Sequence, residues 1–333
     1  MIDVSQVRYD LIAFPPDGSE LHLVPLATKL TSDEQPGELS VRVTAAFQNQ
    51  QVDGGRWLHE FLPNGARLQL MADEGQGFIE VWRGSEFKWL NRDEGARPLT
   101  ITAYDQLIYL MKSKDDRFYP AGATARTILT DIAQKWGVPL GTVDGPDVAL
   151  GKNLFRAKSL AEMILDVLKQ AKTRGAGKWI LRSREGAIDI IQAGQNSPVY
   201  WLRADESVEN AEEEESIEDL VTRVQIMGNA TDDARSPVVA TVDGRTEFGI
   251  LQELVNQAQN DSPDVAQTAA QDLLDERGQP KRTRRLSAPD VPTMRRGDRL
   301  RVTAGTMDGY YLVAGISRDA LAGTMSLEVE DVE

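Results

Sequence analysis

The chain of 333 residues contains no cysteine and only two histidines, His22 and His59. Without cysteine it can form neither disulfides nor thiolate metal sites. Two histidines supply too few nitrogen ligands for the common zinc sites. Both histidines lie next to apolar residues, so we expect half-buried structural side chains rather than catalytic bases. We therefore expect no metal site.

The sequence also lacks the short motifs of familiar enzymes. It has no Gly-x-Ser-x-Gly elbow, no phosphate-binding loop and no dinucleotide fingerprint. The adjacent acids Asp115-Asp116 and Asp232-Asp233 lie in polar stretches, and we expect them in solvated turns rather than as a carboxylate pair. The sequence therefore predicts no catalytic residue.

Basic residues are a minority of the charged residues, and long apolar runs are scarce. The 37 Lys and Arg residues are outnumbered by 52 Asp and Glu residues, which gives a net charge of −15. This argues against general binding to DNA phosphates and suits a surface that DNA passes without sticking. No apolar run approaches the roughly 20 residues of a membrane span. Residues 1–6 lack the features of a signal peptide, so we expect assembly in a cytoplasm without membrane insertion.

Alternating patterns dominate the first hundred residues. A chain of this length is expected to form two or three domains. Between Leu39 and Phe47, apolar and polar residues alternate with the period of a half-buried strand. We expect one side of this strand to be buried, and it consists of Leu39, Val41, Val43 and Phe47. The opposite side consists of Ser40, Arg42 and Thr44 and is expected at a surface.

Residues 105–204 change to a mixed helix and strand pattern. Thr124 is placed to cap a helix that ends before Gly137. Ser159 and Glu162 form the sequence signature of a capping box at the start of a second helix. A hairpin is expected around Glu185-Gly186. These signals predict an α+β unit between two β-rich regions.

The last region opens with an acidic run. Nine acidic and no basic residues lie between Asp205 and Asp219. Two interpretations stay open: a solvated linker or loop, or an acidic surface that faces a basic partner or a DNA channel. A helix over 263–277 and four further strand patterns follow. Basic residues between 281 and 301 suggest either outer strand faces or a docking face for an acidic partner or another copy of the chain.

The order of several weak motifs resembles a known family. These motifs are Leu99–Asp105 leading to the Thr124 helix, Ser236–Gly249, Arg295–Val302, Asp308–Val313 and Gly323–Val329. The order resembles baseplate hub proteins of contractile phage tails, prophage particles and tailocins, such as late control protein D. The resemblance implies a mainly β chain with two tail-tube-like antiparallel β-barrels and a helix-containing middle domain. The expected domains are 1–104, 105–204 and 205–333, with residues 217–242 as an alternative completion of the first barrel.

The resemblance also implies a structural role without a reaction or a cofactor. Three copies would form a homotrimer on the axis of the virion tail baseplate, with six similar barrels around a channel. This ring would join the six-fold tail tube to the three-fold spike. Implied partners are a tail tube or tube-initiator protein, a spike protein and a tape-measure protein, with DNA only as passing cargo. From charge and strand pattern, the interface candidates are Ser40, Arg42, Thr44, Arg282, Arg284, Arg295, Arg296 and Arg299.

Two other functions remain as alternatives. The first is another tail component, such as a tube or tube-initiator protein, although one barrel needs only about 100–150 residues. The second is a tail-associated cell-wall hydrolase, for which the sequence offers no nucleophile, base or metal constellation. The sequence also leaves open whether the particle is a phage, a tailocin or an injection system.

Overall fold

The computed structural model describes residues 7–92, 95, 97–228, 236–256 and 263–332. The chain is mainly β with an α+β insertion, which confirms the predicted fold class. It divides into two compact units, which are Met1–Ala211 with Arg285–Glu333, and Glu212–Arg284. None of the helices in the described ranges is long and apolar enough to cross a membrane.

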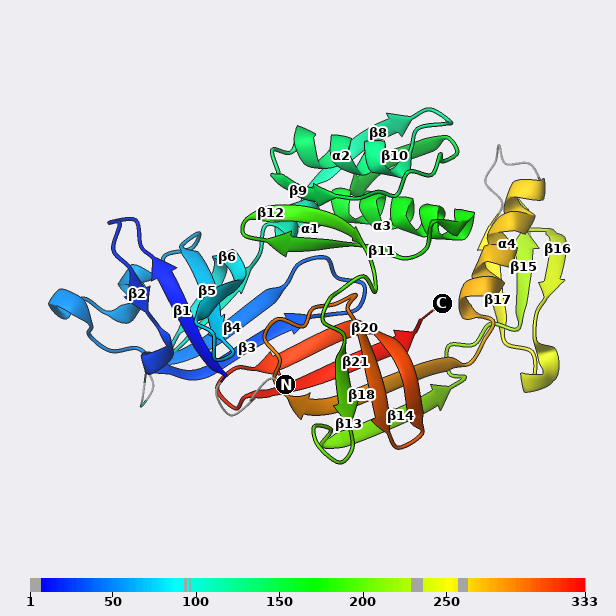
Figure 1. Ribbon diagram of the computed structural model, residues 1–333. Coiled ribbons are helices and arrows are strands. Elements are labelled where there is room, and N and C mark those ends of the chain that lie inside the picture. Colours follow the sequence, from blue (N-terminus) through cyan, green and yellow to red (C-terminus); the bar gives the residue numbers. More distant parts are fainter. Residues whose placement is uncertain (1–6, 93–94, 96, 229–235, 257–262, 333) are drawn as a thin grey trace. The chain divides into compact units, whose positions relative to one another are not determined.

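The first antiparallel part of the larger unit, here called the first lobe, contains seven strands (Figure 1). They are β1 (Arg8–Phe14), β2 (Leu21–His22), β3 (Ala27–Glu34), β4 (Arg42–Gln48), β5 (Arg67–Asp73), β6 (Phe78–Asn91) and β7 (Pro98–Tyr104). Their order in the sheet is β3-β4-β7-β6-β5-β1-β2. As predicted, Val41, Val43 and Phe47 are buried in the core of this lobe. Ala45, Leu68 and Leu99 belong to the same core.

A second part, the second lobe, belongs to the same thirteen-stranded sheet and is antiparallel except where β13 pairs in parallel with β19. Its strands are β13 (Tyr200–Arg203), β14 (Asn210–Ser216), β18 (Lys281–Pro289), β19 (Arg299–Ala304), β20 (Met307–Asp319) and β21 (Thr324–Asp331). The last four agree with the predicted strand patterns. The two lobes meet where β20 pairs with β3, with Ile316 opposite Glu34 and Asp319 opposite Thr31. The lobes are therefore joined through continuous backbone hydrogen bonding.

The middle region forms its own apolar core, as the mixed pattern predicts. Its elements are α1 (Leu107–Lys112), β8 (Lys114–Tyr119), α2 (Ala125–Lys135), β9 (Leu140–Val143), β10 (Asn153–Ser159), α3 (Leu160–Ala171), β11 (Trp179–Arg184) and β12 (Ala187–Gln192). The Thr124 side chain accepts a hydrogen bond from the Thr127 amide, which confirms the predicted cap. Ser159 and Glu162 form the predicted capping box. Leu39 is buried against this core rather than against the core of the first lobe.

The smaller unit differs from the predicted division of the chain. Strands β15 (Arg223–Met227), β16 (Val238–Asp243) and β17 (Gln252–Asn256) form a separate sheet in the order β16-β15-β17. Helix α4 (Pro263–Arg277) packs on it through Ala266, Ala270 and Leu274. Residues 217–242 therefore do not complete the first lobe, and the 263–277 helix belongs to this unit. The reason is that these elements bury their apolar side chains against one another.

The acidic run is only partly a loop, because Glu212 to Glu215 lie in strand β14, whereas Asp205, Glu206, Glu218 and Asp219 lie in turns. The chain leaves the larger unit along β14 and returns along β18, and these two strands are neighbours in the sheet. In the smaller unit, Glu213 pairs with Arg284 at 2.7 Å and Glu215 pairs with Arg282 at 2.6 Å. Glu213 and Glu215 thus have basic partners on the adjacent strand of the same chain.

Candidate functional site: a buried arginine–carboxylate junction

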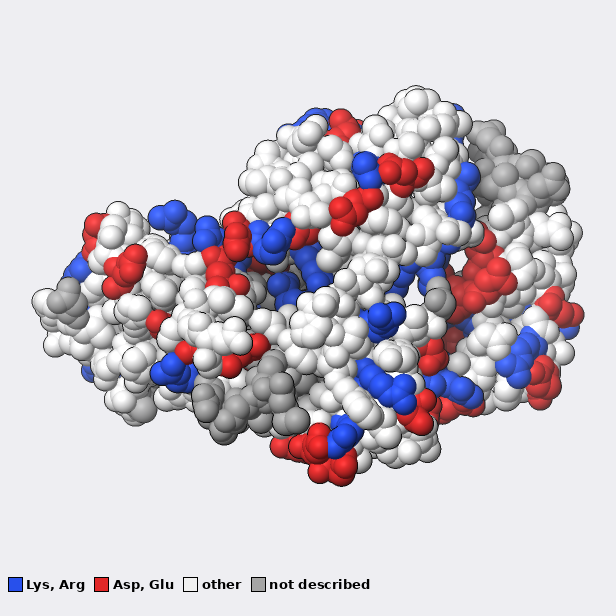
Figure 2. All heavy atoms as spheres, in the orientation of Figure 1, with Lys and Arg blue, Asp and Glu red and all other residues white. Residues whose placement is uncertain are grey.

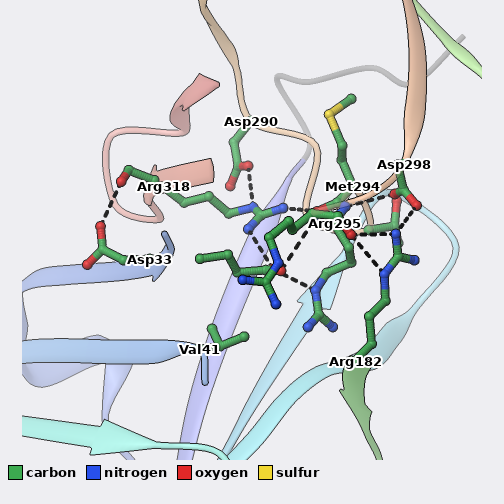
Figure 3. Close-up of polar contacts among 12 residues, drawn as sticks. Asp33, Val41, Arg182, Asp290, Met294, Arg295, Asp298 and Arg318 are labelled. Carbon is green, nitrogen blue, oxygen red and sulfur yellow. Dashed lines mark hydrogen bonds and ion pairs between the residues drawn. The ribbon is translucent and has the colours of Figure 1, made fainter. Parts of the chain in front are cut away.

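The most distinctive site lies in the larger unit where the two lobes and the middle region meet. We call it the junction (Figure 3). Its members are Tyr9, Glu34, Arg182, Asp290, Arg295, Arg296, Asp298 and Arg318. They come from β1, β3, β11, β20 and the segment between β18 and β19. Such a concentration of charge inside a protein requires close pairing, because an isolated buried charge is very unfavourable.

Glu34 is the central carboxylate of the junction. Arg295 Nε donates to Glu34 Oε1 at 2.6 Å, and the side chains of these residues are only 16% and 5% exposed. The Arg296 amide donates to the other Glu34 oxygen at 3.2 Å, and Arg318 lies 3.8 Å away. Burial disfavours the charged form, yet Arg295 and Arg318 outweigh it and hold the pKa of the Glu34 carboxyl below its ordinary value.

Arg318 extends the junction towards the first strand. Its Nε lies 3.2 Å from Asp290 Oδ1, and both side chains are buried. Arg318 also donates to the Met294 carbonyl, and Tyr9 donates from its hydroxyl to Asp290. Figure 3 shows the Arg318 and Arg295 side chains lying next to each other beside the segment that carries Met294. Burial raises the pKa of Asp290, against the effect of Arg318.

Arg182 ties the middle region to the same segment. From β11 it donates to the Arg296 carbonyl at 2.6 and 2.9 Å and to Asp298 Oδ1 at 2.5 Å. Asp298 also accepts from the Arg295 amide at 2.8 Å. The guanidinium therefore satisfies several acceptors at once, as the planar fork of arginine allows. These contacts fix the 294–298 turn between the β11–β12 hairpin and the lobes.

A second buried carboxylate, Asp105, fastens the segment before β4. It accepts from Ser40 Oγ at 2.8 Å, from the Val41 amide at 3.2 Å and from the Leu107 amide at 3.1 Å. Burial raises the pKa of Asp105 to about 6, although these hydrogen bonds favour the ionised form. Asp105 thus links the chain before β4 to the start of α1.

The junction is a set of internally paired side chains. Its carboxylates face arginines or backbone amides, and most of its side chains are buried. In the described part of the chain, no group of three or more His, Cys, Asp or Glu side chains could hold a metal ion. What the arrangement can do is hold three separately formed cores in one fixed relation.

The structure separates the predicted interface candidates into three groups. Ser40, Arg295 and Arg296 make contacts inside the chain, with Arg296 donating to the Gln35 carbonyl at 3.1 Å. Ser40 and Arg295 are thus occupied within the subunit and unavailable as docking contacts, because their polar groups already have internal partners. Arg282 and Arg284 pair with Glu215 and Glu213.

The third group of candidates is at least partly accessible. Arg42 pairs with Asp33 at 3.2 Å, and Thr44 is half-buried on the same face of β4. Arg299 is exposed at the start of β19. On the face of the larger unit shown in Figure 2, basic and acidic side chains are interspersed rather than separated. No broad basic surface appears there.

The two histidines behave differently from each other. His22 is exposed, not half-buried as expected, because it ends the two-residue strand β2 with its ring outside the core. The His22 Nδ1 atom lies 2.5 Å from Asp10 Oδ2. His59 is half-buried, with its ring nitrogen 3.0 Å from Asn49 Nδ2 and its ring 5.9 Å from the centre of the Trp89 ring. Asp232-Asp233 lies outside the described residues.

Sequence reasoning missed the acidic half of the junction. Glu34 and Arg295 are separated by 261 positions, and no local pattern marks either as buried. The only visible signal was the basic Arg295-Arg296 pair beside a turn glycine, Gly297, whose φ is +82°. A buried ion pair between distant segments depends on the fold and cannot be inferred from spacing.

The fold has known relatives among solved structures. The prophage MuSo2 43 kDa tail protein from Shewanella oneidensis matches with a TM-score of 0.68 and 14% identity, covering 98% of both chains. The tail protein from Neisseria meningitidis MC58 matches with a TM-score of 0.67 and 14% identity, covering 97% of both chains. The E. coli c3393 protein, described as a component of the type VI secretion system, matches with a TM-score of 0.53 and 8% identity, covering 98% of this chain and 75% of that one. At these identities the likeness concerns the fold.

Sequence comparison gives the family. YqbQ of Bacillus subtilis (strain 168) is 24% identical over 243 residues, covering 70% of this chain and 73% of that protein. The YqbQ-like family model matches residues 30–330, which is most of the chain. The match includes the middle region, the smaller unit, the second lobe and the first lobe without β1 and β2. The chain therefore belongs to the YqbQ-like family.

Proposed function

We propose that this chain is a structural component of a phage tail or a related injection particle, and that within it the chain forms the baseplate hub. The observation that carries the proposal is the full-length likeness to a prophage tail protein, which covers 98% of both chains. A likeness over such a length includes the arrangement of both lobes and not only one common module. The similarity of c3393, which is described as resembling the T4 tail proteins gp27 and gp5, supports the same reading.

The proposed mechanism is symmetry matching. Each lobe would act as one tail-tube-like barrel, so that a homotrimer presents six similar faces around a channel. A three-fold spike and a six-fold tube could then both bind on equivalent terms. This role demands that the two lobes keep one fixed relation. The β3–β20 pairing and the buried junction supply that rigidity.

We further propose that the chain acts by binding, without a reaction of its own. Its partners would be a tube or tube-initiator protein, a spike protein and a tape-measure protein, with DNA passing through the channel. The net charge of −15 supports passage without retention. The alternative of a tube or tube-initiator protein accounts less well for two lobes in one chain. A cell-wall hydrolase would need accessible acid and base groups, whereas the junction is buried.

The test is the position and copy number of the chain in purified particles. We expect a cryo-EM reconstruction to show three copies on the tail axis, between tube and spike. A six-copy ring, or a position away from the axis, would contradict the hub assignment. A cell-wall hydrolysis assay on the purified protein should show no activity above buffer, and activity there would favour the hydrolase.

A further inference from the structure

The outer face of β13, β19 and β20 carries aromatic and arginine side chains in alternation. We call it the arginine–aromatic face, and it consists of Trp201, Arg203, Arg299, Arg301 and Tyr310. Strand register places Trp201 opposite Arg301, and Arg301 opposite Tyr310. These three residues therefore form one row across three hydrogen-bonded strands. In Figure 1, β13 and β20 can be followed within the second lobe.

The side chains of this face stack on one another. The Arg301 guanidinium lies between the two rings, 5.6 Å from the centre of the Trp201 ring and 5.4 Å from that of Tyr310. Arg203 lies 5.0 Å from the Trp201 ring, and Arg299 lies 5.5 Å from the Tyr310 ring. Cations within about 6 Å of a ring centre are attracted to its face. The five residues thus form a continuous series of alternating cations and rings.

The face is accessible but rigidly supported. Trp201 is 53% exposed and Tyr310 is 51% exposed. The Trp201 indole donates to Thr303 Oγ1 at 3.1 Å, which limits the rotation of the ring. On the opposite side of the same strands, Leu202 and Leu300 are buried in the core of the second lobe. Side chains that are already ordered lose little conformational entropy on binding.

The charge of the face is only partly neutralised. Arg203 pairs with Asp205 at 3.2 Å and with Glu206, and Arg301 pairs with Asp308 at 3.1 Å. Arg299 has no ion pair with any residue in the part of the chain that the structure describes. One positive charge therefore remains at the end of the series, in a chain that is strongly acidic overall.

We propose that the arginine–aromatic face is a docking surface for another tail protein that presents a carboxylate beside apolar side chains. The inference rests on the proposed function, because it looks for the partner among the components of the particle. Trp, Tyr and Arg are the residues most enriched where interface energy is concentrated. The uncompensated Arg299 selects a carboxylate, and the two rings select apolar or aromatic side chains next to it.

Charge distinguishes this partner from two others. DNA binding requires an excess of cations to replace counterions, whereas acidic side chains already engage Arg203 and Arg301. Packing of the face against the same face of a second copy would bring two Arg299 side chains together, and like charges at a contact are unfavourable. A partner protein with a carboxylate needs no excess of cations and brings no like charge close to Arg299.

The test uses particles assembled in cells in which variants replace the native copy of the gene. The variants are the double substitution Trp201→Ala/Tyr310→Ala and the single substitution Arg299→Glu. Arg299→Lys keeps the charge, and Leu321→Ala removes a side chain of similar exposure outside the face. The readout is the amount of this chain per purified particle, measured by quantitative mass spectrometry and normalised to the tube protein.

We expect at least a ten-fold loss of incorporation for the double variant and for Arg299→Glu, with Arg299→Lys and Leu321→Ala close to wild type. Arg299→Glu lies on an exposed face, so it keeps the test informative if the double variant folds poorly. Wild-type incorporation of Arg299→Glu would overturn the inference. So would a change in the molar mass of the isolated variants by light scattering, because the contact would then be with a second copy. Absence of the wild-type chain from particles would instead refute the proposed function.

Discussion

The junction and the interior of the first lobe bury carboxylates in opposite ways. At the junction, Glu34 lies 2.6 Å from Arg295 and accepts a further hydrogen bond from the Arg296 amide. In the first lobe, Glu86 of β6 is 1% exposed, and neither of its carboxyl oxygens has a hydrogen-bond partner among the residues that the structure describes. The pKa of Glu34 is lowered by its arginines, whereas burial raises that of Glu86 to about 7. The buried Glu34 carboxylate is stabilised by arginines, whereas the buried Glu86 carboxyl is stabilised by protonation.

This difference shows in which parts of the fold buried charges are paired. Paired buried charges occur where separate cores meet, and there they fix geometry because each arginine fits only one set of acceptors. The unpaired carboxyl lies inside a single lobe, on a strand with a β-bulge next to it between Glu86 and Lys88. Pairing of buried charges thus fixes the positions of the separate cores relative to one another.

Removing the central carboxylate should have the largest effect. In Glu34→Ala, Arg295 would remain buried without its carboxylate, and breaking a buried pair in this way typically costs about 3–5 kcal/mol. We expect the melting transition of the larger unit to fall by several degrees in differential scanning calorimetry. Glu20→Ala, which removes an exposed carboxylate, should leave the transition unchanged. Equal behaviour of the two variants would show that the junction does not stabilise the fold.

Removing both partners should be milder than removing one. In Glu34→Met/Arg295→Met, no unpaired charge is left at this position, and apolar replacement of a buried pair is often neutral. Arg318 retains its contact with Asp290. We therefore expect the double variant to recover about 2 kcal/mol relative to Glu34→Met alone. Additive losses in this double-mutant cycle would mean that Glu34 and Arg295 act independently.

The Glu86 carboxyl predicts a pH dependence of the opposite sign from a paired carboxylate. The folded protein holds this proton more tightly than the unfolded chain, in which the pKa is near 4.5. The Glu86 contribution to stability is therefore complete below about pH 4.5 and is lost as the pH rises through about 7.

Glu86→Gln replaces the titrating carboxyl by a neutral amide and therefore tests the sign of this pH dependence. Each pKa unit corresponds to about 1.4 kcal/mol, and water entering the site weakens the effect, so we expect the variant to gain about 2 kcal/mol at pH 8. At pH 4 it should match wild type. Urea denaturation at both pH values gives the comparison. A variant that is equally displaced at pH 4 and pH 8 would show that the effect is steric.

Local features of the fold could be predicted from the sequence, but the contacts between its parts could not. The Thr124 cap and the Ser159–Glu162 capping box depend on residues three positions apart, and both are present. The alternation in β4 likewise gave the buried side. The strand within the acidic run was not predicted, because its pairing with β18 involves residues about 70 positions away. That the two lobes are barrels of one type stays a prediction.

The smallest effect is expected at a partly exposed pair on β4. Arg42 and Asp33 lie 3.2 Å apart, with side chains 42% and 17% exposed. Exposed pairs contribute about 0–1 kcal/mol because water and salt screen them. Arg42→Ser should therefore leave the melting transition of the isolated protein almost unchanged. Since Arg42 is also an interface candidate, the same variant is informative in the particle. Normal stability with reduced incorporation would place Arg42 at a contact between subunits, whereas normal incorporation would restrict its role to pairing with Asp33.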